Sequence, residues 1–391
     1  MSIVAKKNII PKSKSRGTAV ESSREESLES LLTGEKLYYY FRKMDTADGS
    51  IFSLAIFDRG SRSQLNKNGA IFLTANGLKV ATVRPLDKLT YPQFAKAGDL
   101  LPDAVIEIKY SDLKNMLKNN SLWPEKGIVH FECVDSSGNL LSESAVFGHP
   151  VGIDLPVPVP DNIVRVGGKV NPDGFLTTGA SWYQAILKTL NNPDIDKKLS
   201  GSSRILDWGV GCGRIIRYFI EDGYKNARGI DIDQFNIDWC KENLPKADFA
   251  RCEFDPPTKF DNDTFELIYA HSVLTHLGLE DEEAWLTELN RILSPTGIGC
   301  VTFTSEFGTH LIHNAHMHSE PEFWTEFWNT GRIDFGEYKI GVDKGRAGYY
   351  RTVAQTQLYV LSVWSQKIDI IKIIPGFANN QDAVIFRKKE V

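Results

Sequence analysis

The sequence lacks several features that would by themselves indicate a class of protein. No apolar run approaches the roughly 20 residues that a membrane-spanning helix requires, so we expect no membrane span. The first residues contain no apolar stretch like that of a secretory signal, and we expect none to be present. Only five cysteines occur among 391 residues, and no two of them form a CxxC pair. Reduced thiols and a cytoplasmic location are therefore expected.

A strong excess of one sign of charge is also missing. The chain has 45 Lys and Arg against 50 Asp and Glu, which gives a formal net charge of −5. A dedicated nucleic-acid-binding protein usually presents a basic face, so we expect no nucleic-acid partner. The length exceeds that of one domain of about 100–200 residues and predicts two or three domains, with the oligomeric state left open.

The N-terminal part divides into three segments by composition. Residues 1–35 combine a basic arm with a Ser/Glu-rich stretch, and so few apolar residues predict a disordered tail; docking of the arm to an anionic surface is the alternative. Residues 36–148 contain short apolar runs separated by turn signals such as Asn76-Gly77, which predict a β-rich, sandwich-like domain. Residues 149–174 hold alternating prolines and are expected to form a linker.

Residues 175–391 show a different pattern, in which strand-like runs alternate with helical periodicity. This alternation predicts βαβ units around a doubly wound, mostly parallel α/β sheet. The turn before the last run is short enough for an antiparallel final pair. The seven predicted strands are residues 204–208, 227–232, 247–252, 266–271, 298–303, 369–374 and 383–388.

The most informative motif follows the first of these strands. It reads Asp207-Trp208-Gly209-Val210-Gly211-Cys212-Gly213 and is expected to open a helix. Glycines allow a sharp bend and a close approach of the backbone to a ligand. Asp231, at the end of the next strand, lies where an acidic residue binds ribose hydroxyls in nucleotide-binding folds. A tight structural turn with a surface aspartate is the alternative.

The glycine spacing is GxGxG rather than the GxGxxG of dinucleotide sites, and it resembles motif I of the class I S-adenosylmethionine-dependent methyltransferases. Three further segments are similar to that family: DNDTFELIYAHSVLTHL (261–277), LTELNRILSPTGIGCVTF (286–303) and QDAVIFRK (381–388). One departure is Thr296, where the family usually has glycine at a structural turn.

The resemblance implies a Rossmann-like sheet of seven strands with an antiparallel last strand, S-adenosylmethionine as cofactor, and methyl transfer by in-line displacement. It places Cys252 and Glu253 in the stretch that contacts adenine, and Ala270 and Ser272 at the cofactor pocket. The expected cofactor-binding residues are Asp207, Gly209, Val210, Gly211, Gly213, Asp231, Ile232, Cys252, Glu253 and Ala270.

A general base is expected near the carboxyl ends of the strands. His276 is the first candidate and His310 the second, because imidazole titrates near neutral pH; His271, Tyr349 and Tyr350 are further candidates. A structural role for His276 is the alternative.

Four histidines between 310 and 318 could be metal ligands, but no cysteine or carboxylate completes a set, so we expect no metal and interpret the segment as a polar lid. Arg214 or Arg217 could hold a cofactor carboxylate or an anionic acceptor.

These expectations define a methyltransferase acting on oxygen or nitrogen of a small molecule, sugar or glycan. The alternative is a binding or scaffold protein that retains the fold while the β-rich domain recognises a partner. A nicotinamide-dependent oxidoreductase is disfavoured by the glycine spacing. Methylation of nucleic-acid amino groups is disfavoured by the charge balance and by Asp255-Pro256-Pro257-Thr258, which departs from the required tetrad.

Overall fold

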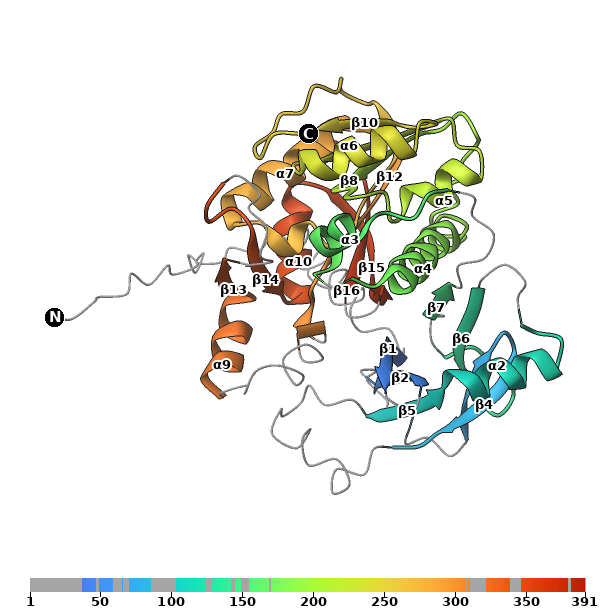
Figure 1. The fold of residues 1–391 in the computed structure, drawn as a ribbon. Helices are drawn as coiled ribbons and strands as arrows, with labels where there is room; N and C mark the ends of the chain where they lie inside the picture. The colour runs from blue at the N-terminus through green and yellow to red at the C-terminus, as the bar shows by residue number, and fades with distance from the viewer. Residues whose placement is uncertain are drawn as a thin grey trace.

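The computed structural model has a strand-rich N-terminal part and a larger C-terminal part with a central sheet (Figure 1). The predicted tail and the histidines between 310 and 318 lie outside the described residues. The structure describes residues 37–46, 49–58, 65, 70–85, 103–123, 128–141, 145–148, 155–168, 170–306, 308–309, 321–337, 346–378 and 381–390.

The N-terminal part contains two antiparallel sheets, which confirms the predicted β-rich module. One has the order β1 (Leu37–Thr46), β2 (Gly49–Asp58), β5 (Ala104–Lys109), and the other β4 (Leu78–Val83), β3 (Ile71–Ala75), β6 (Ile128–Val134), β7 (Ala145–Gly148). Asn76 and Gly77 join β3 to β4 with positive φ angles of 48° and 80°, as an Asn-Gly hairpin turn requires. Helix α2 (Tyr110–Asn119) buries Leu113 and Leu117 in the common core.

The C-terminal part is built on one sheet of seven strands, and it confirms the predicted α/β fold. Strands β8 to β12 are parallel to one another, and β16 is antiparallel to both β12 and β15. The order is β10 (Asp248–Arg251), β9 (Asn226–Asp231), β8 (Arg204–Trp208), β11 (Phe265–Ala270), β12 (Leu293–Phe303), β16 (Gln381–Arg387), β15 (Asp369–Ala378).

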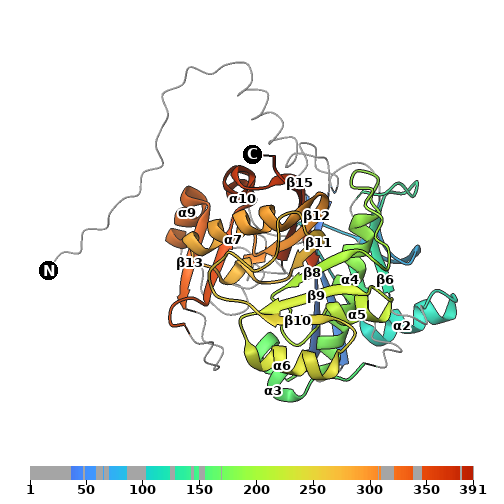
Figure 2. The ribbon, with the colours of Figure 1, turned by 90° about the horizontal axis from the view of Figure 1, so that it is seen from above.

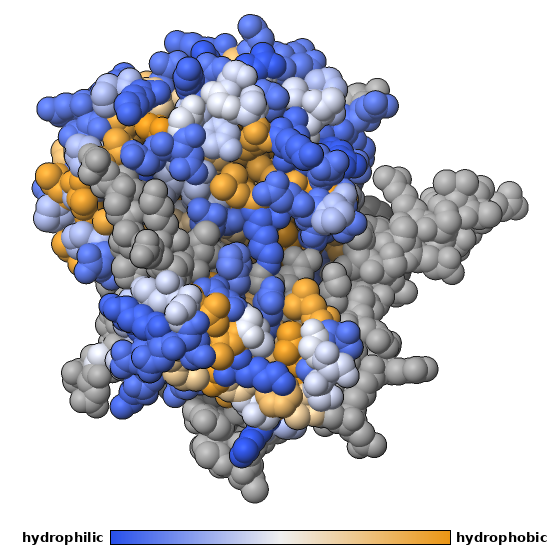
Figure 3. Space-filling view, turned by 90° about the vertical axis from the view of Figure 1, so that its right-hand side faces the viewer, coloured by the Kyte–Doolittle hydropathy of each residue, from blue (hydrophilic) through white to orange (hydrophobic). Residues whose placement is uncertain are grey.

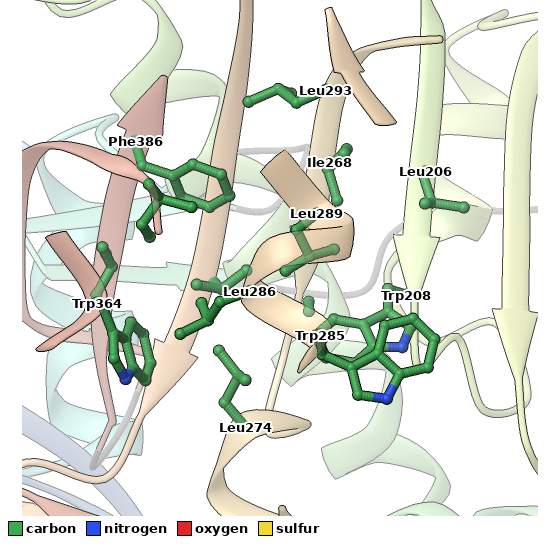
Figure 4. Close-up of a cluster of buried hydrophobic side chains, with 14 of the residues drawn as sticks. Leu206, Trp208, Ile268, Leu274, Trp285, Leu286, Leu289, Leu293, Trp364 and Phe386 are labelled. Carbon is green, nitrogen blue, oxygen red and sulfur yellow. The ribbon is translucent and has the colours of Figure 1, made fainter. Parts of the chain in front are cut away.

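Each face of this sheet has its own hydrophobic core because side chains alternate along a strand. Leu206 and Ile268 contribute to the core that includes helix α7 (Leu279–Ile292), as Figure 4 shows. Their neighbours Ile205 and Leu267 belong instead to the core formed with helix α4 (Pro172–Leu190). Figure 2 shows the strands between these groups of helices. The remaining helices of the fold are α5 (Ile216–Glu221), α6 (Gln234–Asn243) and α10 (Gln357–Val363).

The segment expected to be a linker contains ordered structure. Helix α3 (Pro160–Gly167) lies within residues 149–174, and α4 begins before that segment ends. Proline opens each helix, where its missing N–H costs no hydrogen bond. Arg217 of α5 donates to the carbonyl of Pro156 (3.1 Å), which ties the chain before α3 to the sheet domain. The domain boundaries stay predictions.

The C-terminal part also contains an insertion late in the chain, for which the sequence pattern predicted no helices or strands. It contains helix α9 (Pro321–Thr330) and the two-stranded sheet of β13 (Arg332–Glu337) and β14 (Arg351–Gln355). Short 3-10 helices, η3 (Leu274–His276) and η4 (Trp364–Gln366), follow β11 and α10. Through β14 and η3, this insertion is brought against the carboxyl end of the sheet.

On one side of the molecule, hydrophobic residues occur in separate groups among hydrophilic ones, over both parts of the chain (Figure 3). Across the described ranges, no helix is long and apolar enough to cross a membrane.

Candidate active site

The glycine loop adopts the geometry that its sequence predicts. Gly209 and Gly211 have φ angles of +77° and +51°, a region that residues with a side chain rarely adopt. A Cβ atom added to Gly211 would lie 2.6 Å from a methyl group of Val166, and one added to Gly209 would overlap Val273. The two glycines therefore satisfy both the strained backbone and the narrow space between neighbouring segments.

Asp231 joins the end of β9 to this loop. Its Oδ2 accepts a hydrogen bond from the N–H of Gly211 (2.8 Å), and its Oδ1 accepts one from the N–H of Asp233 (2.8 Å). A carboxylate has about four lone-pair sites and accepts several donors at once, and ribose hydroxyls are donors of this kind. The acidic residue predicted for the second strand therefore lies against the glycine loop, at the pocket.

Asp207, the first residue of the motif, lies beneath the loop. Its side chain is buried, and burial together with the nearby Asp231 raises the pKa of Asp207 to about 7, while Arg214 opposes this shift. The carboxyl group therefore changes charge near neutral pH, in contrast to an exposed aspartate.

A pocket that opens to solvent begins at the glycine loop. Most of its walls come from segments at the carboxyl ends of β8, β9, β10 and β11, where ligands bind in open α/β sheets. The lining residues are Arg165, Val166, Trp208, Gly209, Gly211, Arg214, Asp231, Ile232, Asn236, Cys252, His271, Ser272, Val273, His276, Leu277, Trp285, Tyr349 and Tyr350.

The further candidates Arg214, His271, Ser272, Tyr349 and Tyr350 line this pocket. So do six of the expected cofactor-binding residues and leading base candidates. They are Gly209, Gly211, Asp231, Ile232, Cys252 and His276. Five others do not: Asp207, Val210, Gly213, Glu253 and Ala270. Val210 and Ala270 are buried in hydrophobic clusters, whereas Glu253 is exposed. His310 lies outside the described residues. The cofactor and catalytic roles of all these residues stay predictions.

Helices α3 and α6 form a wall that the sequence did not reveal. Arg165 of α3 makes two hydrogen bonds to Asp233, from Nε (2.7 Å) and from a terminal nitrogen (2.9 Å). Asn162 of α3 donates to the side-chain oxygen of Asn236 of α6 (2.8 Å), and both side chains are buried. These contacts hold α3 over the glycine loop, so Arg165 and Val166 face the pocket.

Aromatic residues form a second wall. Trp208 stacks on Trp285, with ring centroids 4.5 Å apart. Trp285 and Tyr349 both donate to the carbonyl of Phe254, at 2.9 Å and 2.8 Å, and thereby fix the segment after β10. Cys252 lies in the same segment, and burial raises the pKa of its thiol to about 12, so it is neutral. This wall offers flat apolar surfaces of the kind that a purine ring contacts.

Polar residues line another part of the pocket. His271 stacks on Trp182 of α4, and burial, helped by the charges of Arg214 and His276, lowers the pKa of His271 well below its usual value. A histidine with so low a pKa is a weak base at neutral pH. His271 is therefore less suited to proton abstraction than the sequence alone suggested.

His276 is oriented by two contacts with the late insertion. Its Nδ1 lies 2.7 Å from the carbonyl oxygen of Arg351, and its ring stacks on Tyr350 at 4.2 Å between centroids. A carbonyl can only accept, so Nδ1 carries the proton and Nε2 the lone pair in the neutral ring. This is the tautomer that a histidine base requires.

Ser272 has a strained backbone at the rim of the site. Its φ is +57°, which is uncommon for a residue with a side chain. The conformation is held by hydrogen bonds from its N–H to Thr302 (2.8 Å) and from Gln381 to its hydroxyl (2.9 Å). Such strain is concentrated at functional sites, where the surroundings enforce it.

The described ranges contain no group of three or more His, Cys, Asp or Glu residues that could hold a metal ion. Arg217, one of the two arginines expected to bind an anion, does not line the pocket; it donates to the carbonyls of Gly213 (3.0 Å) and Pro156.

Residues 205–297 match a family model described as a methyltransferase domain. This match covers the glycine loop, Asp231 and the segment around His276, and it agrees with the sheet order. The chain contains a class I methyltransferase domain. Its cofactor is S-adenosylmethionine, the methyl donor of this class.

Other known proteins share parts of the methyltransferase domain. A phosphoethanolamine N-methyltransferase of Plasmodium falciparum is 28% identical over 144 residues, which are 36% of this chain and 52% of that protein. The chain therefore spans about half the length of this curated relative.

Solved structures with a similar fold include a protein of Pyrococcus horikoshii, at 15% identity and a TM-score of 0.41 over 58% of this chain and 98% of that one. Another is the 1,6-didemethyltoxoflavin-N1-methyltransferase of Burkholderia thailandensis, at 12% identity and a TM-score of 0.36 over 63% of this chain and 96% of that one. Such distant likeness does not extend to substrate.

Proposed function

We propose that this protein transfers a methyl group from S-adenosylmethionine to an oxygen or nitrogen atom of a small molecule, sugar or glycan. The observation that carries the proposal is the pocket itself, in which the glycine loop and Asp231 face a side that holds His276 and Tyr350. The curated relative is named as an N-methyltransferase of phosphoethanolamine, so N-methylation of a small molecule is among the options.

The residues present fit the cofactor. Gly209 and Gly211 let the loop adopt positive φ angles at the wall of the pocket, and a carboxylate such as that of Asp231 accepts hydrogen bonds from hydroxyl groups like those of ribose. Cys252, whose N–H donates to the carbonyl of Asp231 (2.9 Å), and Trp285 line the pocket and would contact the adenine. When bound, S-adenosylmethionine supplies an already activated methyl group, so the protein has to position the acceptor and remove its proton. His276 accepts that proton at Nε2 while Nδ1 keeps its bond to Arg351.

The cofactor claim is tested by isothermal titration of S-adenosylmethionine and S-adenosylhomocysteine into the full chain. We expect both to bind at one site, and Asp231→Ala to weaken each by about tenfold or more, because its hydrogen bonds involve a charged acceptor. Asp238→Ala is the matched control, since Asp238 lies on helix α6 and does not line the pocket. Absence of binding to the unchanged protein would overturn the proposal.

The pH dependence of cofactor binding tests Asp207. The cofactor carries a net positive charge, so ionised Asp207 favours binding and its protonation opposes it. Since the pKa of Asp207 is about 7 in the protein alone, the affinity for S-adenosylmethionine should fall about tenfold between pH 8 and pH 6. Asp207→Asn should remove most of this dependence.

Titration in two buffers of different ionisation enthalpy measures the proton released on binding. S-Adenosylhomocysteine, which lacks the sulfonium charge, should show a smaller dependence. An equal affinity of the unchanged protein for S-adenosylmethionine at both pH values would contradict this role of Asp207.

A further inference from the structure

Arg214 is one of two arginines that line the pocket. It follows the glycine loop directly and lines the pocket. Among the described residues, its guanidinium makes no hydrogen bond and no ion pair; its contact is with the ring of Trp182, 4.2 Å from the ring centroid. Burial lowers the pKa of Arg214 to about 10, so it remains charged at neutral pH. Arg214 is half-buried, and a charge that is partly removed from water is stabilised by a partner of opposite charge.

The other arginine of the pocket shows what a satisfied partner looks like. Arg165 is held by both oxygens of Asp233, so its charge is already compensated. Asp207 lies close enough to Arg214 to influence its pKa, yet the two side chains do not form an ion pair. Of the two arginines that line the pocket, Arg214 is therefore the one whose charge is not paired with a carboxylate among the described residues.

The position of Arg214 is fixed by helix α4. A Cβ atom added to Gly179 would overlap the carbonyl oxygen of Arg214, so helix and loop are in close contact at this point. Trp182, on the same helix, covers one face of the guanidinium. A guanidinium held in this way presents its remaining donors in a fixed direction, which suits a bidentate contact with a planar or tetrahedral anion.

Asp207 and Cys212 of the glycine-loop motif lie near Arg214. So do Trp182, His271 and Tyr350, and Tyr350 in turn stacks on His276. Trp182, His271 and Tyr350 come from α4, from the end of β11 and from the late insertion, whereas the expected nucleoside contacts come from the ends of β9 and β10. Arg214 therefore shares its surroundings with the candidate base.

We infer that Arg214 binds an anionic group, a carboxylate or a phosphate, of the methyl acceptor. This inference rests on the proposed methyltransferase function and narrows its acceptors to those that carry such a group near the methylated atom. The carboxylate of the cofactor is the other source of this chemistry, and the experiment separates the two.

The test is isothermal titration of the full chain saturated with S-adenosylhomocysteine. The probes are benzoate and phenyl phosphate, with benzyl alcohol as a neutral probe of similar size. We expect at least one anion to bind more tightly than benzyl alcohol, and Arg214→Gln to weaken that anion by about tenfold to a hundredfold, as loss of a charge-assisted contact does. The affinity of Arg214→Gln for S-adenosylhomocysteine should stay within about threefold of the original.

The control is Arg228→Gln, which removes a positive charge from an exposed position of β9. This variant should bind both the anion and S-adenosylhomocysteine as tightly as the unchanged protein. Arg214→Lys keeps the charge but loses the bidentate guanidinium, so it should lower the affinity for the anion by a smaller factor. Circular dichroism shows whether each variant is folded. If Arg214→Gln does not fold, Arg214→Lys provides the comparison.

Three results would overturn the inference. The first is that neither anion binds better than benzyl alcohol. The second is that the Arg214 variants bind anions unchanged. The third is that Arg214→Gln lowers the affinity for S-adenosylhomocysteine by about tenfold or more, because that result assigns Arg214 to the cofactor carboxylate. If the unchanged protein does not bind S-adenosylhomocysteine, the proposed function itself fails, and that result is distinct from the other three.

Discussion

Replacing His276 by asparagine should lower the rate of methyl transfer by about 10²- to 10⁴-fold, the usual contribution of a positioned general base. The asparagine amide can still donate to the carbonyl of Arg351, as Nδ1 of His276 does at 2.7 Å, but it has no basic nitrogen. The substitution therefore removes the base and preserves the local hydrogen bond. Single-turnover rates would be measured with the acceptor identified by mass spectrometry of ligands that co-purify with the protein.

His276→Phe provides the complementary variant. It retains an aromatic ring to stack on Tyr350 but loses both the base and the bond to Arg351. If His276 is the base, both variants lose the rate while the affinity for S-adenosylhomocysteine is kept. If His276 only supports the insertion, His276→Asn should remain active and His276→Phe should not, which would exclude its role as base.

Replacing Glu282 by alanine should reduce the free energy of unfolding by about 3–5 kcal/mol, the cost of breaking a buried ion pair by removing one partner. Glu282 has no exposed surface, and it accepts hydrogen bonds from Trp364 (2.9 Å) and from the Gln355 amide. The guanidinium Nε of Arg332 lies 3.7 Å away. Alanine would leave the Arg332 charge without its carboxylate and two buried donors, those of Trp364 and Gln355, without this acceptor.

The neighbouring Glu283 is the matched control. It lies on the same turn of α7 but is exposed, so Glu283→Ala should change the free energy of unfolding by less than about 0.5 kcal/mol. Urea denaturation followed by tryptophan fluorescence compares the two, since Trp364 itself contacts Glu282. Equal stability of the two variants would show that the buried group does not support the insertion.

The same contacts explain how the insertion reaches the site. Glu282 lies at the start of α7 and contacts residues of β13, β14 and η4, and Arg332 also donates to the carbonyl of Leu277 (2.9 Å). Tyr350 and Arg351, which contact His276, directly precede or begin β14. Loss of Glu282 should therefore loosen the acceptor side of the pocket more than the glycine loop.

The sequence by itself determined the central sheet and the cofactor loop. Each strand has its own apolar run, and the strand-to-helix alternation predicts a mostly parallel sheet; the Rossmann-like form of that sheet followed from the resemblance to the methyltransferases. The loop is equally local, because Gly209, Gly211 and the strand before them are consecutive in the chain. Asp231 could be found because it ends the very next strand.

Only the tertiary structure decided the other walls of the pocket. Arg165 reaches it from a segment that composition assigned to a linker, and Tyr350 from an insertion without a recognised pattern. Trp285 had the periodicity of a core residue, and it is indeed buried, yet its ring also faces the site. Such residues are brought together by packing between segments far apart in the chain, which no local spacing records. That Arg214 makes no ion pair with the described residues is likewise a property of its tertiary surroundings, because the position of an arginine in the sequence does not show which side chains pack against it.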